Sequence, residues 1–269
     1  MPETGNKSGV YKSKDFNPSD SPKYSLSMLL RQDGLSFSIT GQDELLFHQW
    51  IKYAEGRSFI SELEKEIAKN VQLNLDFHSV RVVLEDFPSA LFPIGTVPES
   101  RYHDVLPFGS WFNHREKLTY LKSVVTPNEI ESISLVPERI ESAISQFKNL
   151  EVNTIYGRIS ALAEGKTSFN IYRSAHQIHI VYIKDGKLML ANGFDCTVGS
   201  EAVYFTVAVC NQFGLEPENT PLTLWGEVRD YDSIYLSLKD YYSTIEFGNA
   251  EFEVPSNLFL ESHQVAIYL

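Results

Sequence analysis

Apolar and polar positions alternate in short runs along the first third of the chain and then change to a helical period. They predict three strands, a helix and a fourth strand, at 24–30, 35–39, 45–51, 59–71 and 80–84. The first two runs flank Asp33-Gly34, a pair that two-residue hairpin turns favour. Ser58 precedes the helix, as an N-terminal capping residue does. This part of the chain therefore predicts an antiparallel meander followed by a helix and a strand.

The second half of the chain shows a similar order of elements. Predicted strands at 179–183 and 188–190 flank a second pair, Asp185-Gly186, and another strand is predicted at 222–225. The apolar run within 199–214 contains many β-branched residues and would also suit a buried strand. Its length, the Ser at its start and the Gly at its end favour a buried helix.

The spacing of these features predicts a duplicated unit. The strands that begin at Val80 and Leu222 are 142 positions apart, and the turns at Asp33 and Asp185 are 152 positions apart. A ten-residue shortening of the third strand in the second unit would account for the difference. We therefore expect an α/β protein of two lobes in which Asp33 and Asp185 occupy corresponding hairpins.

The region between the units is less regular. Within 87–113 it contains several prolines and six aromatic residues, Phe87, Phe92, Tyr102, Phe108, Trp111 and Phe112. Prolines exclude a long helix or a central strand here, and a short helix is expected near 100–106. The aromatic residues suit a protein interface, and they equally suit anchors that hold a long loop to its own core. Phe108, Trp111 and Phe112 are the candidate partner-binding residues.

The chain thus divides into three predicted parts. Residues 1–23 are rich in Ser, Pro, Asn, Asp and Lys and carry too little apolar surface to fold, so we expect a flexible tail. Residues 24–156 form the first lobe, with the irregular insertion at 87–113. Strands at 118–125 and 130–136 and a helix after Pro137 complete it. Residues 157–269 form the second lobe.

Charge and cysteine content narrow the classes of function. The 269 residues include 35 acidic and 23 basic side chains, which gives a net charge of −12. This charge argues against general binding to nucleic acid or anionic lipid. Two cysteines are too few for a disulfide scaffold, and the first residues contain no apolar segment for export or anchoring. We expect a cytoplasmic protein without membrane insertion.

Four short stretches resemble a known family. They are Leu26-Ser-Met-Leu-Leu with Asp33-Gly-Leu-Ser-Phe-Ser, Val82-Val-Leu-Glu-Asp-Phe-Pro-Ser-Ala-Leu-Phe92, Phe112-Asn-His114 and Ile133-Ser-Leu-Val-Pro137. They are similar to an uncharacterised domain-of-unknown-function family of bacteroidete bacteria. That family is associated with an actin-like ATPase fold of the ribonuclease H-like class. It is similar to cytoplasmic assembly proteins of type II secretion and type IV pilus systems. The resemblance covers residues 24–269.

The resemblance implies places where a nucleotide would bind, and the sequence departs from the family pattern at each. Actin-like ATPases place an Asp after the first strand, a Gly two positions later and then Ser or Thr. Here Asp33-Gly34 and Asp185-Gly186 are adjacent pairs without that hydroxyl. A glycine pair should follow the strand at 222–225, but only Gly226 is present. If ATP with magnesium binds, these five residues are the candidate contacts.

The sequence gives little support for other kinds of catalytic or metal-binding chemistry. There is no G-x-S-x-G, Walker or G-x-G-x-x-G motif, and the histidines and cysteines show no metal-ligand spacing. We therefore assign no catalytic residue and no metal ligand. The leading interpretation is a non-hydrolysing binding or scaffold module for an unidentified cytoplasmic protein. The alternatives are a divergent ATP-binding protein or ATPase, and an accessory protein acting on nucleic acid. The oligomeric state is left open.

Overall fold

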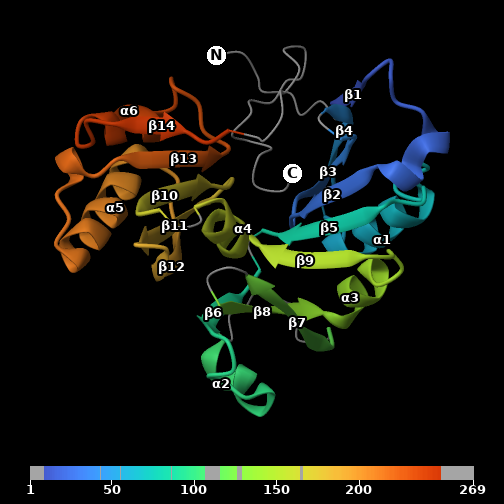
Figure 1. Ribbon diagram of the computed structural model, residues 1–269, viewed down its shortest axis with the longest axis horizontal. Coiled ribbons are helices and arrows are strands. Elements are labelled where there is room, and N and C mark those ends of the chain that lie inside the picture. The colour runs from blue at the N-terminus through green and yellow to red at the C-terminus, as the bar shows by residue number, and fades with distance from the viewer. Residues whose placement is uncertain are drawn as a thin grey trace.

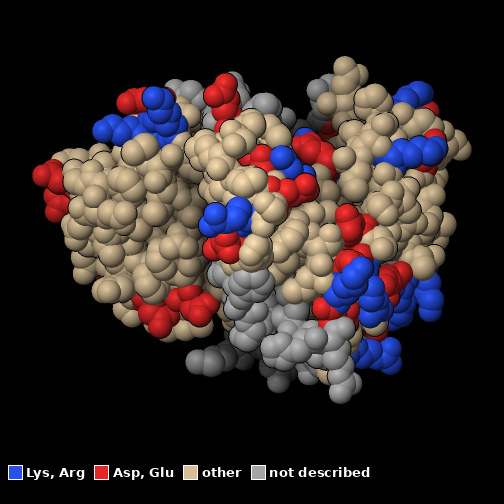
Figure 2. Space-filling view, turned by 90° about the horizontal axis from the view of Figure 1, so that it is seen from below, with Lys and Arg blue, Asp and Glu red and all other residues tan. Residues whose placement is uncertain are grey.

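The computed structural model describes residues 9–42, 44–54, 56–85, 87–106, 116–125, 129–163 and 166–249. These residues form two lobes, each built on a mixed β-sheet, and a small three-stranded sheet lies below the first lobe in Figure 1. None of the helices in these residues is long and apolar enough to cross a membrane. Acidic and basic side chains lie interspersed on the face shown in Figure 2.

The first lobe is built on a six-stranded sheet. In spatial order its strands are β1 (Val10–Lys12), β4 (Leu45–Lys52), β3 (Gly34–Thr40), β2 (Ser25–Leu30), β5 (Ser79–Leu84) and β9 (Leu150–Thr154). β2, β5 and β9 are parallel, whereas β3 and β4 continue from β2 by antiparallel pairing. Helices α1 (Phe59–Lys69) and α3 (Glu138–Ile144) bury Ile60, Leu63 and Ile140 in the core of this lobe. The meander, helix and strand predicted from the pattern are present.

Residues 9–23 belong to the first lobe, so the expected flexible tail over 1–23 is wrong for this part. β1 pairs with β4 at the edge of the sheet, and a 3-10 helix, η1, spans Pro18–Lys23. Phe16 is buried in the core, with its ring 5.6 Å from that of Phe47. One aromatic side chain thus anchors a segment whose composition is otherwise polar.

The second lobe is built on a five-stranded sheet. In spatial order its strands are β12 (Lys187–Asp195), β11 (Gln177–Lys184), β10 (Ser168–Arg173), β13 (Leu222–Gly226) and β14 (Ile245–Phe247). Helices α5 (Gly199–Phe213) and α6 (Ser233–Lys239) pack on one face, and a short 3-10 helix, η3, spans Pro217–Asn219. The apolar run that could have been a strand is α5. It ends at Gly214, whose left-handed φ of 65° suits a glycine.

Apart from β1, the strands of the two sheets have the same order and directions, while the duplication itself stays a prediction from the sequence. β2, β3, β4, β5 and β9 correspond to β10, β11, β12, β13 and β14. The sequence pattern misses β10, and the second unit therefore starts one strand earlier than expected. Asp33 lies between β2 and β3, whereas Asp185 lies between β11 and β12. The expectation that these two residues occupy corresponding hairpins is wrong.

A third sheet lies within the region between the units. Its order is β6 (Ser89–Pro93), β8 (Ile130–Pro137) and β7 (Leu118–Val125), all antiparallel. The 3-10 helix η2 (Glu99–Arg101) and the helix α2 (Tyr102–Val105) follow β6. Part of the insertion expected to be irregular is thus a strand, and Pro93 is compatible with it because β6 is an edge strand. Tyr102 and Leu106 form a small separate core with Ile133 and Leu135.

Helix α4 (Ile155–Leu162) lies at the junction of the two lobes (Figure 1). Thr154 begins it, with its hydroxyl accepting a hydrogen bond of 3.1 Å from the Gly157 N–H. This helix, the residue after it and strands of both sheets contribute to one buried apolar cluster, made of Leu29, Val83, Ile155, Ile159, Ala163, Tyr172, Val181, Ile183 and Trp225. The lobe boundary expected near residue 156 falls within this helix.

Candidate functional site

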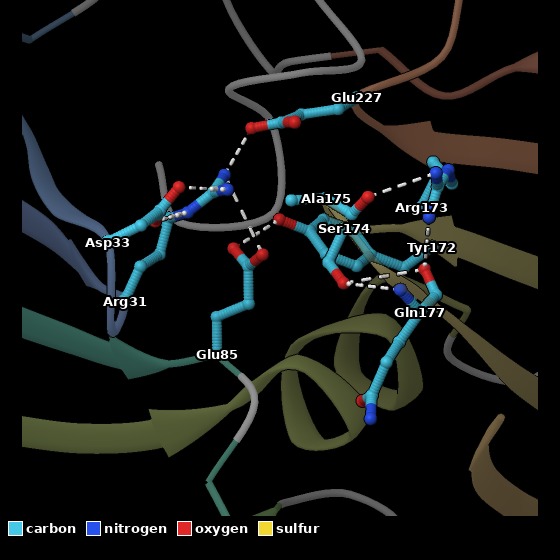
Figure 3. Close-up of polar contacts among 9 residues, drawn as sticks. All are labelled: Arg31, Asp33, Glu85, Tyr172, Arg173, Ser174, Ala175, Gln177 and Glu227. Atoms are coloured by element: carbon cyan, nitrogen blue, oxygen red, sulfur yellow. Dashed lines mark hydrogen bonds and ion pairs between the residues drawn. The ribbon is translucent and has the colours of Figure 1, made fainter. Parts of the chain in front are cut away.

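The carboxyl ends of four strands meet where the two lobes face each other. β2 and β5 end here in the first lobe, and β10 and β13 end here in the second. Because parallel strands present their carboxyl ends at one edge of a sheet, the residues that follow them gather in one place. Figure 3 shows Arg31 after β2, Glu85 after β5 and Glu227 after β13, with Tyr172 at the end of β10.

Arg31 is the centre of this cluster. Its Nε and Nη2 donate to the carboxylate of Asp33 at 2.8 and 3.3 Å, and Nη1 lies 3.7 Å from Glu85 Oε1. Nη1 also donates to Glu227 in the other lobe (Figure 3). The side chain is only 6% exposed, and its guanidinium carbon lies 5.1 Å from the Trp50 ring centroid.

The charge of Arg31 is stabilised by its neighbours. Burial disfavours a charged guanidinium, but Glu85, Glu227 and Asp33 outweigh this effect and raise the pKa of Arg31 above its usual value. The four side chains together carry one positive and three negative charges. A fully buried carboxylate such as Glu85 needs a compensating partner, and Arg31 supplies it within the same lobe.

A second polar contact crosses between the lobes. The Tyr172 hydroxyl donates a hydrogen bond of 2.8 Å to Glu85 Oε2, and both side chains are almost completely buried. Burial, followed by the charge of Glu85, raises the pKa of the Tyr172 hydroxyl well above its usual value, so it remains a donor. Glu85 therefore receives a cation from its own lobe and a hydroxyl from the other.

The turn after β10 is held by its own side chains. Arg173 donates to the carbonyl oxygens of Gln177, Cys196 and Ala175 at 3.1, 2.9 and 3.1 Å. The Ser174 hydroxyl, which is buried, accepts a hydrogen bond of 3.2 Å from the Gln177 N–H. Arg173 thus fixes the shape of this hairpin and lies on the far side of Tyr172 from Arg31 (Figure 3).

Three of the five nucleotide candidates lie at this junction. Asp33 is the half-exposed partner of Arg31. Gly34 begins β3, and a Cβ there would lie 2.4 Å from the Trp50 ring and 2.5 Å from the Ile51 carbonyl. Gly34 is therefore needed for close packing and not for the turn. Its φ is not positive, and the turn is formed by the two residues before it. Gly226 ends β13 with a φ of 80°, and its neighbour Glu227 projects to Arg31.

The other two candidates lie elsewhere. Asp185 and Gly186 form the turn between β11 and β12, with φ values of 51° and 75°, as a two-residue hairpin of type I′ requires. The Asp185 side chain accepts a hydrogen bond of 3.3 Å from Thr167. Their assignment to the same site as Asp33 is wrong. The partner-binding candidates Phe108, Trp111 and Phe112 lie outside the described residues.

The residues with the strongest contacts were not predicted from the sequence. Arg31, Glu85 and Glu227 each follow a strand directly, and Tyr172 lies within one that the pattern misses. A charged residue placed right after a buried run was the available signal. Both cysteines are buried and free, and burial raises the pKa of each thiol. The described His, Cys, Asp and Glu side chains form no group that could hold a metal ion.

Solved structures show what this architecture is similar to. A Bacteroides thetaiotaomicron protein with an actin-like ATPase fold and unknown function matches with a TM-score of 0.71 and 18% identity, over 87% of this chain and 93% of that one. The PilM-PilN type IV pilus biogenesis complex matches with a TM-score of 0.53 and 13% identity, over 91% and 96%. No curated protein matches the sequence.

The cytoplasmic domain of EpsL, an inner membrane component of the type II secretion system of Vibrio cholerae, has a TM-score of 0.37 and 12% identity, over 75% of this chain and 80% of that one. That similarity is too low to bear on function. A family model described as "Protein of unknown function (DUF3822)" matches residues 13–245. This chain therefore belongs to the DUF3822 family, and its fold is the actin-like ATPase fold.

Proposed function

We propose that this protein is a non-hydrolysing binding or scaffold module that uses the actin-like fold to dock a protein partner in the cytoplasm. The observation that carries the proposal is the contact between Arg31 of the first lobe and Glu227 of the second. It lies where the carboxyl ends of β2, β5, β10 and β13 meet. Side chains of the two lobes thus contact each other directly at the junction.

The charge of the junction supports the absence of hydrolysis. A nucleotide triphosphate would bring further negative charge next to Asp33, Glu85 and Glu227, while the Arg31 cation is already neutralised by them. Solvent screens this repulsion only in part, because Glu85 is fully buried, whereas Asp33 and Glu227 are about half exposed. Phosphate sites instead present unpaired backbone donors and cations.

The assignment of a protein partner rests on two observations. PilM, whose fold this chain shares, was solved in a complex with PilN. The net charge of −12 also disfavours nucleic acid as the ligand. Contacts between the two lobes favour a preformed surface, which lowers the cost of docking a partner.

The alternative is a divergent protein that binds ATP with magnesium. Asp33, Gly34 and Gly226 lie near the junction and are the residues that would contact it, whereas Asp185 and Gly186 are too far along the sheet to take part. Binding would require Arg31 to leave its carboxylate partners and pair with the phosphates instead.

The test is to measure ATP binding and hydrolysis by the purified chain. We expect no phosphate release and no rise in melting temperature with millimolar ATP and Mg²⁺. At a ligand concentration of 100 times Kd, binding would add about 2.7 kcal/mol to stability, so even weak binding is visible. A rise that Gly226→Val or Asp33→Asn removes would establish the alternative. Capture of the same protein partner with and without ATP would support the scaffold role.

A further inference from the structure

A groove of about 750 Å³ separates the second lobe from the three-stranded sheet. One wall is β6 with Ile94, and the other is the first five residues of β12, Lys187 to Ala191. β6 and β12 are both end strands of their sheets, and β6 is the strand of its sheet that lies nearest β12 in Figure 1. Two strand edges thus border one groove.

The backbone of β6 directs hydrogen-bonding groups away from its own sheet. Pro88 and Ile94, which flank the strand, hydrogen-bond to the backbone of β8 and the residue before it. Because the direction alternates along an antiparallel strand, Ser89 and Leu91 direct their N–H and C=O groups to the opposite side. Pro93 has the same direction, so its missing N–H interrupts no bond to β8. This edge therefore offers the N–H groups of Ser89 and Leu91 to an added strand, whereas Pro93 supplies no donor at its end.

The β12 wall differs in character. Its pairing with β11 shifts register at Tyr182 and Ile183, and such a bulge interrupts the regular ladder on the outer edge as well. Met189 lies at the bulge and is 44% exposed, and Ile94 on the other wall is 48% exposed. This wall therefore offers apolar contact more than hydrogen bonds.

The two walls carry opposite charges. Lys187 lies on the β12 side, and Glu129, which is next to β8, lies on the β6 side. An occupant that pairs with β6 must be extended, must present an apolar side chain to Met189, and gains from an acidic residue near Lys187 and a basic residue near Glu129.

We propose that an extended segment of a partner protein with this chemistry binds in the groove as a fourth strand on β6, with β12 as an apolar wall. Strand addition accounts for both walls, because backbone hydrogen bonds form on one side and side chains pack on the other. This inference rests on the proposed role as a protein-binding module and specifies the partner's binding mode and location.

The experiment selects binders from a displayed library of random peptides about ten residues long, which covers a strand and its flanks. Binding of the selected peptides is then measured by fluorescence anisotropy to the full chain and its variants. Leu91→Pro removes one outward N–H at a position where an edge strand tolerates proline. Leu118→Pro makes the same change in the first residue of β7, on the other edge of the same sheet, and is the matched control.

We expect Leu91→Pro to weaken binding about tenfold or more and Leu118→Pro to leave it unchanged. Met189→Glu is expected to weaken binding without touching any backbone group. Lys187→Glu is expected to weaken only those peptides that carry an acidic residue. These two variants keep the test valid if either proline variant fails to fold.

The inference would be overturned if the library yields no binding peptide. It would also be overturned if the selected peptides bind Leu91→Pro and the unmodified chain equally. Loss of binding in Ala191→Pro with retention in Leu91→Pro would assign the strand to β12 and would also overturn it. Each result is separate from the ATP measurements, which decide the proposed lack of hydrolysis without involving this groove.

Discussion

The Tyr172 hydroxyl donates a hydrogen bond of 2.8 Å to Glu85 Oε2 across the boundary between the two lobes. Both groups are buried, so neither can exchange its partner for water. Together with the contact between Arg31 and Glu227, this bond means that polar groups in the interior of the junction are paired with partners in the other lobe. The lobes are thereby connected by specific contacts as well as by the apolar cluster around α4.

Removal of the Tyr172 hydroxyl should destabilise the protein. Tyr172→Phe keeps the ring but leaves a buried carboxylate oxygen of Glu85 without this donor, and we expect a loss of about 1–3 kcal/mol. Chemical denaturation measures the loss. Tyr241→Phe, at a tyrosine that is 49% exposed, is the control and should change stability by less than about 0.5 kcal/mol. Equal effects of the two changes would contradict a role for the cross-lobe bond.

Loss of the Arg31 side chain should lower the free energy of unfolding more than loss of the Tyr172 hydroxyl does. Arg31→Met leaves Glu85 charged and buried without its cation, for which we expect a loss of about 3–5 kcal/mol. The loss should shrink at acidic pH, because protonation of Glu85 removes the buried charge. Arg81→Met breaks a more exposed pair with Glu151 and should cost about 0–1 kcal/mol. Denaturation at two pH values distinguishes the two variants, and a pH-independent loss in Arg31→Met would argue against this explanation.

His48 should make stability depend on pH. Burial lowers its pKa from 6.5 to about 4, and its Nδ1 lies 2.8 Å from the Ser38 hydroxyl. The folded state thus favours the neutral ring, so its contribution is complete above pH 6.5 and is lost as the pH falls toward 4. Between neutral pH and about pH 4.5 this loss amounts to about 2–3 kcal/mol.

The measurement compares His48→Gln with the unmodified chain at both pH values. We expect the difference in unfolding free energy between them to narrow at the acidic pH, since glutamine does not titrate. His176→Gln, at an exposed histidine, should leave the pH dependence unchanged. A constant difference between His48→Gln and the unmodified chain would show that the fold does not oppose protonation there.

Gly226 should tolerate substitution less well than Gly214, which also has a positive φ. Its φ is 80°, and an added Cβ would lie 2.3 Å from the Arg173 carbonyl oxygen. At Gly214, φ is 65° and no atom lies within 4 Å of the added Cβ. We expect Gly214→Ala to cost about 1–2 kcal/mol from backbone strain alone and Gly226→Ala to cost clearly more. Melting temperatures compare them, and similar losses would mean that the turn can move away.

Much of the fold could be predicted from local patterns. The strands β2 and β5 and the helix α5 follow from periodicity and from the residues at their ends. β10 was missed although Phe169 and Ile171 alternate with Ser168 and Asn170, because this alternation extends over only a few residues. Missing that one strand shifted the expected correspondence of the two lobes and placed Asp185 in the wrong hairpin.

The candidate site was less predictable, because it depends on contacts between distant residues. Arg31 and Glu227 are 196 positions apart, and no spacing rule connects them. The glycines at 34 and 226 do lie near the junction, while their role as nucleotide contacts stays a prediction. The charged side chains that follow the strands have only a weak signal, their place right after a buried run, because a solvated surface residue produces the same sequence.

Because the first lobe is synthesised before the second, the contacts at the junction form in a set order. Arg31 and Glu85 both belong to the first lobe, so their ion pair is available as soon as that lobe is synthesised. β9, the last strand of the first lobe, ends at Thr154, and Tyr172 follows 18 positions later. At about 5–20 residues per second, the ribosome adds those residues in roughly 1–4 s. During that interval Glu85 has its cation but not its hydroxyl partner, and Tyr172 makes its contact only when the second lobe emerges and folds against the first.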